Sequence, residues 1–382
     1  MTLPPPPGSV PPGGSQPPYG GQGEYPSVGN QSPAWQQPVP VPAPTRKGGS
    51  GWKWALGGIA ILSIIGVTAA VTLSVANKGD GGPGSPTATP PTATAGGAMH
   101  PDIASANDTG PVRVILEDPS CKTRYPIAST LDSRTRNGWE QRDPVMPATD
   151  WTPEVRAQYQ AAAQAFRDAA DQLIPSAKLT PHRVMRELYE QFIAYARAYA
   201  DSIPSYRPID NNLAAVAIQA SDALSRICAA IDYGSAAARG PLAPAPPVPS
   251  EVAPVRDPAD AQKLLSEPNP VCPEWNSVLE QYFANSKSWN EINPDIPGAE
   301  WSPEQRRIND DVVPVMKLLN TQLSALGRDS GSPTLRDLVD LSVQYRQAYL
   351  EALPTYTPAD DNLVGVATRI ANLVNFACKA MG

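Results

Sequence analysis

The chain has 382 residues and a formal net charge of −7, and its 46 prolines and 28 glycines are unevenly spread. This mildly acidic balance argues against a nucleic-acid partner, which requires a basic surface. Only two histidines are present, His100 and His182, so a Ser/His/Asp triad or a histidine metal cluster is nearly excluded by supply alone.

Residues 1–53 are rich in Pro, Gly, Ser and Gln, as in MTLPPPPGSVPPGG and PVPVPAP. Such a segment buries too little apolar surface to offset chain entropy, so we expect a disordered tail with local polyproline II structure. Its proline runs are of the kind that SH3 or WW domains bind. The tail therefore either binds a cytoplasmic partner or binds nothing.

Residues 54–76, WALGGIAILSIIGVTAAVTLSVA, contain no charged side chain. At about 1.5 Å per residue they span roughly 34 Å, enough to cross a bilayer core of about 30 Å. Arg46, Lys47 and Lys53 precede this stretch, and the positive flank stays in the cytoplasm. We expect a single-pass cell-membrane protein with a cytoplasmic N-terminus and extracytoplasmic C-terminal domains. A signal peptide cleaved after Ser74-Val75-Ala76 is the alternative.

Residues 77–110 form a Ser/Thr/Pro/Gly stalk, compatible with O-glycosylation or with a bare spacer. A Pro/Ala-rich linker at 234–258 then separates two stretches of globular composition, 111–233 and 259–382. These stretches match each other at a constant shift of 150 residues. For example, PSYRPIDNNL at 204–213 returns as PTYTPADDNL at 354–363. The shift predicts a tandem duplication.

Apolar residues recur with a period near 3.6 in each repeat, and no alternating strand pattern is present. Thr152-Pro153 and Ser302-Pro303 predict helix starts, because a hydroxyl cap precedes a proline at the first helical position. Further helices are expected from Thr180-Pro181 and Ser332-Pro333, after the duplicated ten-residue stretch, and after the first cysteine of each repeat. These patterns predict an all-α fold of two tandem four-helix-bundle-like repeats.

Four cysteines bracket the repeats, Cys121 and Cys228 the first, Cys272 and Cys378 the second. Of the three possible pairings, the duplication favours Cys121–Cys228 and Cys272–Cys378, because the first and fourth helices of an up-down-up-down bundle are antiparallel neighbours. A metal site is the disfavoured alternative, since thiolate zinc sites use closely spaced cysteines. We expect structural disulfides, no metal and no cofactor.

Duplicated aromatic residues form the candidate interaction surface: Trp139, Trp151 and Tyr206, with Trp289, Trp301 and Tyr356. One interpretation has the tryptophans stacking on a sugar or lining a groove. The favoured interpretation has them plugging the end of each bundle.

The duplicated acids are Glu154 with Glu304 and Asp210 with Asp360. Two of them could hydrolyse a glycosidic bond if they faced one cleft. All lie at predicted helix starts, where the helix dipole favours an acid, so we prefer that role. The group 210–212, Asp-Asn-Asn, echoed by Asp-Asp-Asn at 360–362, could also offer oxygens to calcium, but it lacks the spacing of a calcium-binding loop.

The Pro/Gly/Gln/Tyr-rich tail, single membrane helix, Thr/Pro stalk and Ala-rich helical ectodomain with few cysteines together resemble proline-rich single-pass envelope membrane proteins of actinobacteria, especially mycobacteria. The resemblance covers the layout and composition of the whole chain. It implies a location in the envelope and carries over no catalytic residue.

The leading hypothesis is a non-enzymatic, membrane-anchored envelope protein that presents two extracytoplasmic helical bundles to a protein or envelope component. The alternative is a carrier or sensor that holds an apolar, lipid-like ligand between helices, where small residues such as Ala162 and Ala169 leave room. A third hypothesis is an envelope carbohydrate hydrolase that uses Glu154, Asp210 or their counterparts.

Overall fold

The computed structural model describes residues 102–136, 138–246 and 248–382. The predicted tail at 1–53, the predicted membrane helix at 54–76 and the predicted stalk as far as residue 101 lie outside the described residues. The described part belongs to one unit, Thr92–Gly382. It consists of helices and connections without a strand, so the all-α prediction is confirmed for this part of the chain.

Each repeat contains four longer helices in the same order. The first repeat has α1 (Ser120–Thr135), α2 (Pro153–Leu179), α3 (Arg183–Ser202) and α4 (Asn211–Asp232); the second has α6 (Cys272–Asn285), α8 (Pro303–Asp329), α9 (Pro333–Ala352) and α10 (Asp361–Lys379). Two short helices, α5 (Ser235–Arg239) and α7 (Lys287–Asn290), lie in the connections. Within each repeat, consecutive long helices pack on each other and the fourth also contacts the first.

The predicted hydroxyl caps form at three helix starts. The Thr152 hydroxyl accepts from the backbone N–H of the third residue of α2, and Ser302 and Ser332 do the same for α8 and α9. Helix α3 differs, because it begins at Arg183 instead of Pro181. There the Thr180 hydroxyl donates to the Asp118 carboxylate and accepts from the His182 N–H, so it orders the turn that precedes the helix.

Both predicted disulfides are present. Cys121 pairs with Cys228 and Cys272 with Cys378, with Cα–Cα separations of 5.5 and 5.4 Å. Each bond joins the first turn of the first long helix of a repeat to the end of its fourth. The pairing confirms that these two helix ends meet.

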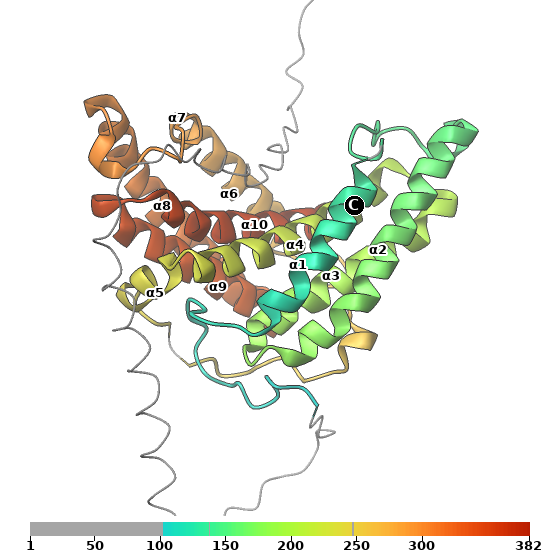
Figure 1. Ribbon diagram of the computed structural model, residues 1–382, viewed down its shortest axis with the longest axis horizontal. Coiled ribbons are helices and arrows are strands. Elements are labelled where there is room, and N and C mark those ends of the chain that lie inside the picture. Colours follow the sequence, from blue (N-terminus) through green and yellow to red (C-terminus); the bar gives the residue numbers. More distant parts are fainter. Residues whose placement is uncertain (1–101, 137, 247) are drawn as a thin grey trace, which may run out of the picture. The chain divides into compact units, whose positions relative to one another are not determined.

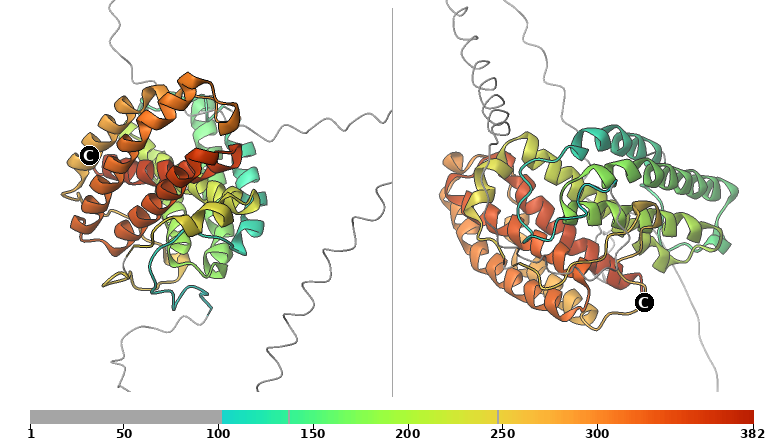
Figure 2. Two further views of the ribbon diagram at one scale, coloured as in Figure 1. Left: turned by 90° about the vertical axis from the view of Figure 1, so that its left-hand side faces the viewer. Right: turned by 90° about the horizontal axis from the view of Figure 1, so that it is seen from below.

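The two repeats pack against each other mainly through α4 and α10, which lie side by side at the centre of the views in Figures 1 and 2. The helices are antiparallel: Asn212, at the start of α4, donates to the Lys379 carbonyl at the end of α10 (3.3 Å). Arg226, near the end of α4, pairs with Asp361 at the start of α10 (2.8 Å). Buried residues of both repeats therefore form one continuous core.

The predicted linker and the end of the predicted stalk are parts of this folded unit. In the linker, Nε and Nη2 of Arg239 bond the two carboxylate oxygens of Asp360, each at 3.2 Å. In the stalk, Ile103 is buried and the Ala104 N–H donates to the Lys178 carbonyl (2.9 Å). The packed part therefore extends to at least Ile103, and not only to the boundary at residue 111 that composition indicates.

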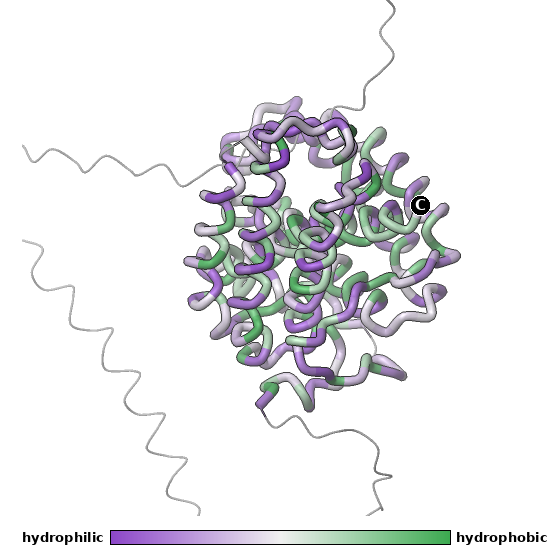
Figure 3. The backbone as a smooth tube through the Cα atoms, turned by 90° about the vertical axis from the view of Figure 1, so that its right-hand side faces the viewer, coloured by the Kyte–Doolittle hydropathy of each residue, from purple (hydrophilic) through white to green (hydrophobic). Residues whose placement is uncertain are grey.

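The long helices other than α1 are amphipathic, and hydrophilic and hydrophobic residues follow one another within their turns (Figure 3). Among the residues that the structure describes, one helix is long and apolar enough to cross a membrane, Pro208–Asp232, which includes α4. More than half of it is buried inside the protein. Because it also carries Cys228 and packs on α3 and α10, it has the properties of a core helix.

Candidate binding sites at the paired tryptophans

In the first repeat the paired tryptophans are part of a closed aromatic cluster. The Trp151 ring stacks on Tyr159 with centroids 4.0 Å apart and lies 5.3 Å from Tyr206. Trp139 donates from Nε1 to the Tyr199 hydroxyl at 2.7 Å. None of these five side chains is more than 7% exposed. The burial of these rings agrees with the interpretation in which the tryptophans plug the end of the repeat.

An arginine completes the cluster. The guanidinium carbon of Arg142 lies 3.5 Å from the centroid of the Trp139 ring. Its Nη1 donates to the Trp139 carbonyl (2.9 Å) and its Nη2 to Oδ1 of Asn211 (2.5 Å). Burial raises the pKa of the Tyr199 phenol, and the positive charge of Arg142 opposes part of that rise. The first repeat therefore holds a cation of its own against the aromatic rings.

The second repeat keeps the same aromatic frame. Trp301 lies 5.2 Å from Tyr356, against 5.3 Å for the corresponding pair of the first repeat. Trp289 lies 5.9 Å from Tyr349, the separation of the corresponding pair. The Tyr356 hydroxyl donates to the Pro294 carbonyl at 2.7 Å, as its counterpart donates to Pro144. The duplicated residues thus hold one geometry in two places.

The residues that fill this frame differ between the repeats. At the shift of 150 residues, Arg142, Tyr159 and Phe166 correspond to Ile292, Asn309 and Met316. The smaller side chains leave a cavity of about 150 Å³ in the second repeat. Its lining includes four aromatic rings, Asn309 and a carboxylate: Trp289, Trp301, Tyr349, Tyr356, Asn309 and Asp361.

The cavity has a carboxylate where the first repeat has an amide. The amide of Asn211 is replaced by the carboxylate of Asp361. Burial raises the pKa of the Tyr356 phenol, and Asp361, Asp360 and Asp295 raise it further. Asp361 Oδ2 accepts one hydrogen bond, from Arg226. The positive charge of Arg226 opposes part of the rise in the Tyr356 pKa, and the cavity therefore combines aromatic walls with a carboxylate that is already paired on one oxygen.

The six aromatic residues of the candidate interaction surface do not form an exposed patch. Five of them are buried, and only Trp289 is partly exposed. The reason is that rings from successive elements pack on one another at the end of each repeat. The residues that the repeats share did not point to Ile292 or Asn309, and they pointed to Asp361 only as part of a possible calcium group. The sequence signal for the cavity is the set of positions at which the two repeats differ.

The duplicated acids have structural partners. Glu154 and Glu304 lie exposed in the first turns of α2 and α8. The carboxylates of Asp210 and Asp360 each accept a backbone N–H three residues earlier, at 2.8 Å. Within the described ranges, no three His, Cys, Asp or Glu side chains are placed to hold a metal ion.

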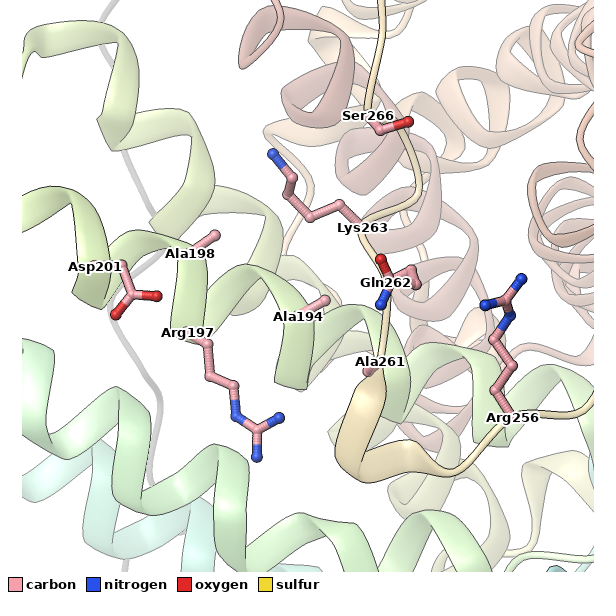
Figure 4. A pocket seen from close by; sticks show the side chains of 9 residues that line it. All are labelled: Ala194, Arg197, Ala198, Asp201, Arg256, Ala261, Gln262, Lys263 and Ser266. Carbon is pink, nitrogen blue, oxygen red and sulfur yellow. The ribbon is translucent and has the colours of Figure 1, made fainter. Parts of the chain in front are cut away.

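A second cavity, of about 470 Å³, lies between α3 and residues 256–266 (Figure 4). Its lining contains three cations, Arg197, Arg256 and Lys263, and one acid, Asp201. Arg197 is held in place by hydrogen bonds to the Ala259 carbonyl and to an aspartate of α2. Such a charged lining does not suit an apolar ligand.

Comparison with known proteins places the chain in a family. Residues 103–382 match the family model described as mycobacterial ESX-1 associated protein. An uncharacterized protein of Mycolicibacterium smegmatis (strain MKD8) is 50% identical over 354 residues, which cover 90% of each chain. No solved structure matches. Both matches support the mycobacterial part of the resemblance seen in the sequence. The chain belongs to the family of mycobacterial ESX-1 associated proteins.

Proposed function

We propose that this chain is a non-enzymatic, membrane-anchored envelope protein that holds a protein component of the ESX-1 secretion system on its extracytoplasmic helical repeats. The observation that carries the location is the pair of disulfides, Cys121–Cys228 and Cys272–Cys378. Disulfides persist in oxidising compartments and are rare in the cytoplasm. Both lie on the C-terminal side of the apolar stretch 54–76, which supports a span there with residues 1–53 inside.

The family match supports the partner. It covers residues 103–382, which coincide with the packed part of the chain and exclude the tail. This match supports the proposal that the helical repeats carry the association with ESX-1. A partner of SH3 or WW type for the proline-rich tail is a separate proposal, since it rests on the proline runs alone.

The geometry gives less support to the other two functions. A lipid carrier needs a large apolar cavity, but the 470 Å³ cavity is lined by charges and the 150 Å³ cavity is smaller than the roughly 300 Å³ at which ligand pockets begin. A hydrolase needs an acid free to transfer a proton. Asp360 is instead held by Arg239 and by the backbone N–H and hydroxyl of Thr357.

Thiol trapping in a mycobacterial host tests the location. Cells are lysed in a maleimide reagent, and the full chain is compared with a variant that lacks residues 54–76. The full chain should have no free thiol, whereas the variant without the span should remain in the cytoplasm and be labelled. Free thiols in the full chain would contradict the proposed topology.

Cross-linking in intact cells tests the partner. Purification of the full chain should recover components of the ESX-1 system, and the variant without the span should not recover them. Recovery of no ESX-1 component with the full chain would remove the partner from the proposal and leave the topology standing.

A further inference from the structure

We propose that the cavity in the second repeat binds the guanidinium group of an arginine side chain from a partner protein. This inference rests on the proposed function, because it gives the chemistry by which a protein partner is recognised. The first repeat shows the bound arrangement within the same chain: the guanidinium of Arg142 lies over the Trp139 ring, 3.5 Å from its centroid, and donates to Asn211.

The second repeat keeps the aromatic frame but has Ile292 at the position of Arg142. The turn that presents the side chain is kept: the Arg142 N–H donates to the Trp139 carbonyl at 3.2 Å, and the Ile292 N–H donates to the Trp289 carbonyl at 3.1 Å. The Trp–Tyr separations of the two frames agree within 0.1 Å. The space that Arg142 fills in one repeat therefore corresponds to the cavity beside Ile292 in the other.

The acceptor in the second repeat is stronger. Asn211 offers one amide oxygen, whereas Asp361 offers the two oxygens of a carboxylate, with about four lone-pair positions. Arg226 takes one of these positions, at Oδ2 (2.8 Å). Hydrogen bonds between charged groups are roughly twice as strong as those between neutral groups. Asp361 in place of an asparagine thus favours a cationic side chain in the cavity. Because Ile292 carries no charge, that cation has to come from another molecule.

Size and access fit one side chain. A volume of about 150 Å³ equals roughly five water molecules at about 30 Å³ each, which is too small for a drug-sized ligand. Trp289 is partly exposed, and Asn290 and Asn293 on the lining are exposed, so a side chain from another molecule can enter. Arginine fits better than lysine, because its planar guanidinium stacks on tryptophan while it also bonds a carboxylate.

Tryptophan fluorescence of the full chain in detergent micelles measures binding of two probes. The first is arginine blocked at both ends, and the second is citrulline blocked in the same way, which has nearly the same shape but no charge. The blocked arginine should bind saturably, and citrulline should bind at least about tenfold more weakly, since the cation–π and charge-assisted contacts are lost. Equal binding of both probes would overturn the proposal.

Three variants locate the site. Ile292→Arg introduces an arginine at the position that corresponds to Arg142 and should abolish binding of the blocked arginine. Asp361→Asn should weaken that binding. Leu318→Arg adds an arginine at an exposed position of the same repeat, where the native side chain is 57% exposed, and should bind like the native chain. Circular dichroism checks that each variant is folded. Undiminished binding by a folded Ile292→Arg variant would refute the assignment.

The same variants separate this inference from the proposed function. If Ile292→Arg loses the cross-link to an ESX-1 component and Leu318→Arg keeps it, the cavity recognises the partner. If both variants keep the cross-link, the inference fails and the proposed function stands. Binding of free arginine without binding of the blocked form would show a metabolite site and would also overturn the proposal.

Discussion

The ion pair between Arg183 on α3 and Asp337 on α9 joins the two repeats inside the protein. Nε of Arg183 lies 2.7 Å from Oδ2 of Asp337, and Nη2 lies 3.2 Å from Oδ1. The two side chains are 3% and 0% exposed. Replacing Asp337 with alanine removes the carboxylate and leaves the guanidinium buried.

Removal of one partner from a buried ion pair costs about 3–5 kcal/mol. Two features place this case at the lower end of that range. Arg183 keeps its hydrogen bonds to the carbonyls of Asp108 and Gly110. In addition, burial and then the neighbouring Asp337 raise the pKa of Glu187 well above its usual range, so loss of Asp337 removes one of these causes and lowers the cost of a negative charge near Arg183. We expect Asp337→Ala to lower the free energy of unfolding by about 3 kcal/mol at pH 7.

Urea unfolding followed by circular dichroism measures this loss. Because the repeats share one core, the native chain and the variant should each unfold in a single transition, with a lower midpoint for the variant. The double variant Arg183→Met/Asp337→Leu should recover much of the loss, since it removes both charges. As a control, Arg307→Ala breaks two exposed ion pairs, with Glu304 and Asp311, and should cost less than about 1 kcal/mol. A loss under about 1 kcal/mol for Asp337→Ala would refute the reasoning, and two separate transitions would refute the shared core.

Three further changes have expected outcomes. Replacing Cys272 and Cys378 with serine should lower the free energy of unfolding in urea by about 2–5 kcal/mol, because the bond closes a loop across most of a repeat; an unchanged midpoint would contradict this. Burial raises the pKa of Glu190 from 4.5 to about 7, so the folded state binds a proton that the unfolded state releases near pH 4.5. Its contribution to stability is complete below about pH 4.5 and is lost as the pH rises to 7, so Glu190→Gln should flatten the decline of the urea midpoint over that interval; an equally steep decline would argue against the shift. Thr152→Ala removes the α2 cap and should cost about 0.5–2 kcal/mol in thermal unfolding, whereas Thr152→Ser should cost little.

The sequence by itself determined the features that depend on local chemistry or on the duplication. Thr152 and Ser302 predicted helix starts because a hydroxyl followed by proline satisfies free backbone N–H groups within one turn. The disulfide pairing followed from the repeat of two cysteines at one shift. These inferences needed only neighbouring residues and the antiparallel order of consecutive helices.

The tertiary structure decided what the apolar stripes of α4 and α10 pack against. An apolar period shows that a face of a helix is buried, but it does not identify the surface that covers it. The apolar period therefore predicts a buried face on each helix, and only the structure shows that α4 and α10 pack on each other.

The structure also decided which of the two tryptophan sites is filled. The sequence aligns Trp139 with Trp289 and Arg142 with Ile292, but it does not show that these positions face a common space. A cavity is the difference between the volume that a frame encloses and the volume of the side chains that enter it. That difference depends on residues from several helices, so it is determined only when the whole chain has folded.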